Sequence, residues 1–127
     1  MENENPTDGI TDAFGIVASY FSVLSEPMRL RIMHAICDEE KTVSQIVEEL
    51  GATQTNISRH LSLMHRGGVL ARRKDGNQVR YRVADAAMVE ICRSVCNRIA
   101  AQMDEKMPMR RELLRLIPRP KRKKSGV

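Results

Sequence analysis

The sequence predicts a mainly α-helical domain with a single β-hairpin. Apolar residues recur at helical spacing over most of residues 10–66 and again over residues 85–106. Between these regions, two short basic segments flank Asp75-Gly76-Asn77, a sequence typical of a hairpin turn. With 127 residues, of which 42% are hydrophobic, the chain can bury one core. We expect a disordered N-terminus over 1–9, one folded domain over 10–107 and a basic C-terminal tail over 108–127.

The first expected helix is apolar on two sides. One line of apolar residues follows a heptad-like spacing and consists of Ile10, Phe14, Val17, Phe21 and Leu24. A second line consists of Ile16, Tyr20 and Val23. A helix of this kind needs more than the core of its own domain to cover it. The pattern therefore favours pairing with a second copy of the chain.

Start signals place the next two helices. Pro27 fits the first turn of the second helix, with the hydroxyl of Ser25 as its expected cap. Thr42 and Gln45 fit a capping box, in which each side chain bonds the backbone of the other, at the start of a short third helix. We expect Leu30, Met33, Ile36 and Cys37 on the buried face of the second helix.

The fourth helix follows the third across a tight turn. Gly51 and Ala52 form the turn, Thr53 caps the helix and Gly67-Gly68 ends it. A short helix, a tight turn and a capped helix that begins with small polar residues are typical of a helix-turn-helix, which places its second helix in the major groove of DNA. The Arg-rich hairpin that follows is the expected wing, and the last helix is expected over 85–106.

The basic residues are concentrated in two regions. The formal net charge is +5, yet residues 1–52 carry three basic and ten acidic side chains. Residues 53–82 carry seven basic and one acidic, and residues 110–127 carry eight basic and one acidic. Such concentration indicates that particular elements meet a polyanion. Since only 3% of the residues are aromatic, the sequence disfavours a single-strand or RNA binder that stacks bases.

Several other classes are excluded by what the sequence contains. The longest apolar runs are too short for a membrane span, and the acidic, polar N-terminus does not read as a signal peptide. Three cysteines at these spacings are unlike a disulfide framework, so we expect a cytoplasmic protein. Because the sequence carries neither a phosphate-binding loop nor a nucleophile–base motif, we expect no enzyme activity and no cofactor.

Three separated motifs resemble the ArsR/SmtB family of bacterial repressors. They are SEPMRLRIMHAI, ATQTNISRHLSLMHRGGVL at residues 52–70, and DGNQVRYRV, in the order that the family has them. The resemblance covers about residues 10–105. It implies a dimeric winged helix-turn-helix, paired through its first and last helices, that binds double-stranded operator DNA and releases it on a metal, metalloid or thiol-reactive signal.

The resemblance also implies which residues face DNA. Arg59 is the strongest candidate for a base contact or a phosphate clamp. The candidate DNA-binding residues are Thr53, Gln54, Thr55, Asn56, Ser58, Arg59 and His60 on the helix, and Arg72, Arg73, Lys74, Asn77, Gln78 and Arg80 on the wing.

The cysteines are the candidates for sensing. The last helix has no histidine, which disfavours a zinc or nickel site. The thiol-switch branch of the family, which senses reactive sulfur species or oxidants, places one cysteine on the second helix and one on the last, near His34 and Ala100 here. Cys37 lies three residues after the first of those positions, and Cys96 lies four residues before the second. If the two helices pack antiparallel, both thiols are shifted by one turn in the same direction, and we hypothesise that they pair.

Two alternatives stay open for the cysteines and one for the whole protein. Cys37, Cys92 and Cys96 could together hold As(III) or another thiophilic ion as inducer. They could equally be small hydrophobic side chains of the core. Instead of a repressor that reads an inverted repeat, the protein could be a nonspecific architectural DNA-binding protein with structural cysteines.

Overall fold

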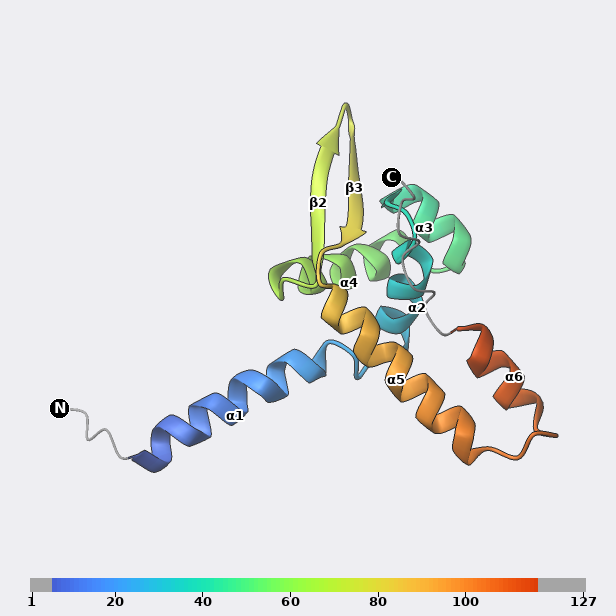
Figure 1. Cartoon of the computed structure of the whole chain (residues 1–127). Coiled ribbons are helices and arrows are strands. Elements are labelled where there is room, and N and C mark those ends of the chain that lie inside the picture. Colours follow the sequence, from blue (N-terminus) through green and yellow to red (C-terminus); the bar gives the residue numbers. More distant parts are fainter. Residues whose placement is uncertain (1–5, 117–127) are drawn as a thin grey trace, which may run out of the picture.

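The computed structural model describes residues 6–116, and their side chains from Gly9 onward. It confirms the predicted mainly α-helical domain with a β-hairpin wing. The hairpin stands out from one end of the domain, α1 extends from its side, and α5 and α6 lie at the opposite end (Figure 1). The elements are α1 Pro6–Ser22, α2 Pro27–Ile36, β1 Lys41–Thr42, α3 Val43–Leu50, α4 Gln54–Arg66, β2 Leu70–Asp75, β3 Gln78–Val83, α5 Ala86–Gln102 and α6 Pro108–Arg115.

The hairpin belongs to a small antiparallel sheet with strand order β1-β3-β2. In the wing, Asp75 is paired with Gln78, and Gly76 takes a φ of 62°, a left-handed conformation that suits glycine. Strand β1 is a difference from the sequence prediction: Lys41 pairs with Tyr81. A strand of two residues carries no alternation, so periodicity had no signal to detect.

The core lies where α2, α3, α4 and the base of the hairpin meet. The buried faces of α2 and α4 meet there, and Val69, Tyr81 and Met88 close it from the hairpin and α5. Its fully buried side chains are Ile32, Met33, Ile36, Ile46, Ile57, Leu61, Met64, Val69 and Met88. Leu30, which we expected on the buried face of α2, is instead exposed.

The helix caps confirm one prediction and correct another. At α3 the Thr42 hydroxyl accepts from the Gln45 backbone N–H at 3.1 Å, and the Thr42 N–H donates to the Gln45 side chain at 2.8 Å. The predicted capping box is therefore present. At α2 the cap is Glu26, whose carboxylate accepts from the Arg29 N–H, whereas the Ser25 hydroxyl donates back to the Ser22 carbonyl.

Replacing Thr42 with alanine should lower the free energy of unfolding by about 1–2 kcal/mol, because an orphan N–H loses its partner at the start of α3. Urea denaturation measures this change. Ser44→Ala, on the exposed side of the same helix turn, is the matched control and should change stability little. Equal effects of the two substitutions would contradict this account of the cap.

The ends of the domain differ from the expected boundaries. Helix α1 begins at Pro6, so residues 6–9, which we expected to be disordered, are helical. The last long helix ends at Gln102 rather than near Lys106, and α6 occupies part of the expected basic tail. The remainder of the predicted N-terminus, 1–5, and of the tail, 117–127, lies outside the described residues. Among the described residues, no helix is both long enough and apolar enough to cross a membrane.

Candidate DNA interface and cysteine pocket

Helices α3 and α4 form the predicted helix-turn-helix. Gly51 ends α3 in a left-handed conformation with a φ of 65°, and its N–H donates to the Val47 carbonyl. Thr53 then caps α4 by accepting from the Asn56 N–H at 3.2 Å. Because the first turn of α4 carries no acidic residue, the positive end of the helix dipole is left available to an anion such as a DNA phosphate.

The outer face of α4 carries most of the predicted DNA-binding residues. Gln54, Thr55 and Arg59 are exposed, and Asn56 and Ser58 are half-buried. The Arg59 guanidinium donates to the Asn56 side chain at 3.0 Å, which holds both groups on the same face. The opposite face of α4 is in the core, so the outward face is the one that can enter a groove.

His60 does not belong to that face, and its assignment to DNA binding was wrong. Its side chain is buried, with 7% exposure. Its Nδ1 lies 3.4 Å from the Arg29 guanidinium, and its Nε2 lies 3.7 Å from the Glu26 carboxylate. Since Arg29 also donates to the Val23 carbonyl at 2.8 Å, His60 packs α4 against the junction of α1 and α2. These partners are about 30 positions away in the sequence, so no local sequence pattern predicts the contacts.

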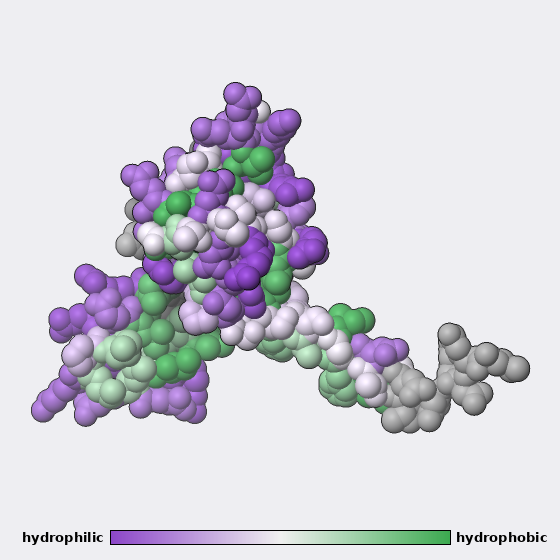
Figure 2. Space-filling model, turned by 180° about the vertical axis from the view of Figure 1, so that it is seen from behind, coloured by the Kyte–Doolittle hydropathy of each residue, from purple (hydrophilic) through white to green (hydrophobic). Residues whose placement is uncertain are grey.

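Some basic side chains of the wing are paired with carboxylates and others are not. Arg73 is paired with Glu40, which precedes β1, and the pairing holds the pKa of that carboxyl below its usual range. Arg80 donates to Asp75 across the hairpin at 2.8 Å, and this bond lowers the pKa of Asp75. By contrast, the structure pairs neither Arg72 nor Lys74 with a carboxylate among the residues it describes; both are exposed, as are Asn77 and Gln78. Hydrophilic residues accordingly cover the hairpin end in Figure 2.

The Glu40 carboxylate is a partner of Arg73 that the sequence prediction missed. Replacing Glu40 with glutamine frees Arg73 for a phosphate, so the slope of log affinity against log salt on random duplex DNA should steepen by about one unit. The exposed Glu39 forms no ion pair among the described residues, so Glu39→Gln removes the same charge and serves as control. If both variants steepen the slope equally, the change in total charge explains the effect, and the pairing of Arg73 with Glu40 does not affect DNA binding.

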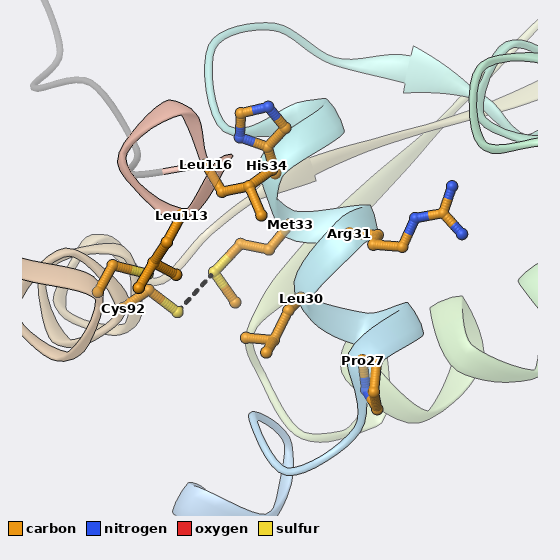
Figure 3. Close-up of a pocket in the computed structure, with 9 residues that line it drawn as sticks. Pro27, Leu30, Arg31, Met33, His34, Cys92, Leu113 and Leu116 are labelled. Carbon is orange, nitrogen blue, oxygen red and sulfur yellow. Dashed lines mark hydrogen bonds between the residues drawn. The ribbon is translucent and has the colours of Figure 1, made fainter. Parts of the chain in front are cut away.

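A pocket of about 240 Å³ lies between α2, α5 and α6. The aliphatic side chains of Pro27, Leu30, Leu113 and Leu116 point towards it together with Cys92, as Figure 3 shows. Its lining residues are Pro27, Leu30, Arg31, Met33, His34, Cys92, Cys96, Leu113 and Leu116.

The three cysteines are free thiols in different surroundings. Cys92 is buried, and its thiol donates to the Met33 sulfur at 3.6 Å. Burial, with the nearby Cys96, raises the pKa of Cys92 to about 11. Burial likewise raises the pKa values of Cys37 and Cys96. All three are therefore mostly protonated at neutral pH, which slows their reaction as thiolates.

The structure places Cys37 apart from the pocket. Its thiol donates to the His34 carbonyl at 3.3 Å, and its charged neighbours include Asp38 and Arg93. Within the described part of the chain, no three Cys, His, Asp or Glu side chains are grouped so as to hold a metal ion. The structure does not bring Cys37 together with Cys92 and Cys96.

Comparisons with known proteins agree with these elements. A family model described as "Bacterial regulatory protein, arsR family" matches residues 26–71. The probable mercury resistance operon repressor of Streptomyces lividans is 33% identical over 96 residues, which are 72% of this chain and 77% of that protein.

Two solved structures share the fold. Rv0081 of Mycobacterium tuberculosis superposes with a TM-score of 0.64 at 28% identity, covering 71% of this chain and 94% of that one. NolR from Sinorhizobium fredii superposes with a TM-score of 0.66, covering 76% of this chain and 95% of that one. At 23% identity, the second likeness shows the fold alone.

Proposed function

The chain belongs to the ArsR family of bacterial regulatory proteins and is a DNA-binding transcriptional repressor rather than an enzyme; we propose that it binds an inverted-repeat operator as a homodimer. The observation that carries the proposal is the outward face of α4, which joins exposed polar side chains to an uncompensated helix N-terminus. In the proposed complex, the first turn of α4 and Arg59 read base edges in the major groove. Arg72 and Lys74 contact the backbone from the wing.

The apolar surfaces of α1 and α5 support the homodimer. Phe14 is 69% exposed and Phe21 is 53% exposed on α1, and Val95 and Ile99 are exposed on α5. Helix α1 extends away from the domain (Figure 1), so little of its own chain covers this face. Contiguous exposed apolar surface of this kind marks a protein interface. Two protomers related by a two-fold axis would present their α4 helices to half-sites about 10 bp apart.

We further propose that a cysteine-based signal, a reactive sulfur species or an oxidant, releases the repressor from DNA. Cys96 is the better placed of the two residues in our hypothesised pair, because it lies on α5 close to the exposed Val95 and Ile99. Cys92, one turn away, is a better supported partner for it than Cys37, because Cys92 and Cys96 line the same pocket and Cys37 does not.

A disulfide between Cys92 and Cys96 would distort α5. Residues four apart on a helix have Cβ atoms about 5–6 Å apart, whereas a disulfide needs about 4 Å. In this reaction the two thiols lose two electrons and two protons, which a peroxide takes up to form two water molecules. A distorted α5 would alter the pairing of the protomers and, with it, the spacing of the α4 helices.

Hydrogen peroxide or a polysulfide should lower operator affinity of the unaltered protein and remove two hydrogens from its intact mass, while Cys96→Ser should respond to neither. Gel shifts and intact-mass spectrometry measure both effects. Cys92→Ser and Cys37→Ser identify the partner, because only the partner's variant should also lose the response. A protein that keeps three unmodified thiols while it releases DNA contradicts the covalent signal.

A specific observation favours a second candidate signal, a soft metal ion. Cys92, Cys96 and Met33 place three sulfur atoms around one pocket, and soft ligands select soft ions. The Streptomyces relative is named as a repressor of mercury resistance. Mass spectrometry of the metal-treated protein separates this candidate from the oxidant, because a metal adds mass whereas a disulfide removes it.

A further inference from the structure

The pocket between α2, α5 and α6 combines sulfur ligands with a mostly aliphatic wall. Cys92 lies against Met33 with 3.6 Å between the sulfurs, and Cys96 lines the same space. The polar end of Arg31 does not enter it: the guanidinium donates to the Leu50 carbonyl at 2.9 Å and points away from Cys92 in Figure 3. The pocket therefore offers two thiols and a thioether within a largely hydrocarbon wall, to which His34 also contributes.

Helix α6 completes the wall on the open side. Leu30 of α2 points towards the side where Leu113 of α6 lies (Figure 3), and Pro27 and Leu116 also line the pocket. The Arg110 side chain donates to the Ala100 carbonyl at 3.0 Å, which fastens α6 to the end of α5. Leu113 and Leu116 thus have a role in the pocket that their place in a basic tail does not suggest.

The size of the pocket suits an organic group rather than a bare ion. Its volume of about 240 Å³ exceeds the roughly 150 Å³ of a buried cavity that takes up benzene. A bare metal ion bound to the thiols would leave most of this volume empty. An apolar wall also has too few polar ligands to replace the water molecules that a hydrated ion loses on entry. A hydrocarbon group bonded to the metal fills that volume.

We propose that this pocket binds a soft, monovalent organometal cation that carries a small hydrocarbon group. The metal exchanges its acetate or chloride ligand for the sulfur of Cys92 or Cys96, the displaced anion and the S–H proton pass to solvent, and no electrons are transferred. The adduct is neutral, because a cation replaces a proton, and so it leaves no unpaired charge in the apolar wall. Once the Cys92 proton is gone, the Met33 sulfur loses that donor and is free to approach the metal.

The pKa values of the thiols separate this class from organic electrophiles. Both Cys92 and Cys96 are held protonated at neutral pH by burial, which slows addition to an electrophilic carbon. A soft metal displaces the proton as its bond to sulfur forms, since metal binding by thiols releases protons. Binding of the organometal cation to the pocket needs no DNA. The inference rests on the proposed repressor function only where it treats the bound cation as the signal that releases DNA.

The test compares phenylmercuric acetate with methylmercuric chloride on the free, full-length protein. After each is added, glutathione is titrated in and intact-mass spectrometry follows the adduct. The unaltered protein should retain one phenylmercury adduct per protomer, and removing it should take about tenfold more glutathione than removing methylmercury, because the ring buries more apolar surface. Cys37→Ser, which lies outside the pocket, should behave like the unaltered protein.

Variants of the wall and of the thiols make the test specific. Leu113→Ala should lower the retention of phenylmercury towards that of methylmercury while the thiols stay in place. The double variant Cys92→Ser/Cys96→Ser, in which only the Cys37 thiol remains, should lose both probes at the first additions of glutathione. Equal retention of the two probes by the unaltered protein, or an adduct that maps to Cys37, overturns the proposal. Operator binding, measured separately by gel shift, reports on the repressor function, so either idea can fail without the other.

Discussion

Replacing Phe14 and Phe21 with glutamate should convert the protein to a monomer and lower its operator affinity at least about a hundredfold, because linking two weak half-site contacts supplies that gain. Both phenylalanines lie on the exposed apolar face of α1, where Phe21 also contacts the ring of Tyr20. Two carboxylates on this face cannot be buried against a second copy without a large desolvation cost. Sedimentation measures the oligomeric state, and fluorescence anisotropy with labelled operator measures affinity.

Ser19→Glu is the matched control for this substitution. Ser19 is exposed on the opposite side of α1, so one carboxylate there should leave both the dimer and operator affinity nearly unchanged. Circular dichroism of all the variants checks that the helices persist. A double variant that stays dimeric, or a monomer that keeps full affinity, would contradict the role that we assign to α1.

Replacing Arg59 with alanine should weaken operator binding by about tenfold to a hundredfold, the loss expected for one bidentate contact to a base. The effect should be much smaller on random duplex DNA, since the predicted contact reads a base edge rather than the backbone. Within residues 6–116, the side chain of Arg59 bonds only to Asn56 and is exposed, so the substitution should cost little stability. Titrations with operator and random duplexes at one salt concentration make the comparison.

Arg111→Ala provides the control for the loss of an arginine. Arg111 is exposed on α6, at the end of the domain away from α4 and the wing. Its replacement should lower both affinities slightly and in equal proportion, as a change in overall charge does. An Arg59 variant that behaves in the same way would show that Arg59 clamps a phosphate instead of reading a base.

Local signals in the sequence predicted those features that neighbouring residues determine. The capping box of Thr42 and Gln45, the cap at Thr53 and the turn at Gly76 each arise from bonds or φ values within a few residues, and all three are present in the structure. The polar face of α4 was predictable for the same reason, because helical periodicity fixes which residues share a face.

Some errors were local, such as the cap of α2 and the start of α1, but three others concern side chains whose partners are distant in the sequence. His60 has the spacing of a residue near the DNA-facing surface, yet Arg29 and Glu26 hold it inside. The pairing of Arg73 with Glu40 depends on β1, which is too short to leave a pattern. Likewise, the pocket exists because Leu113 and Leu116 of α6 reach α2, a contact between segments about 80 residues apart.

Selection of bound duplexes from a random pool, followed by the mass of the resulting complex, tests the central claim most directly. A homodimeric repressor should enrich an inverted repeat with half-sites about 10 bp apart, and each selected duplex should carry two protomers. A nonspecific architectural protein binds every duplex with comparable affinity. Recovery of unbiased sequences at physiological salt would therefore contradict the account.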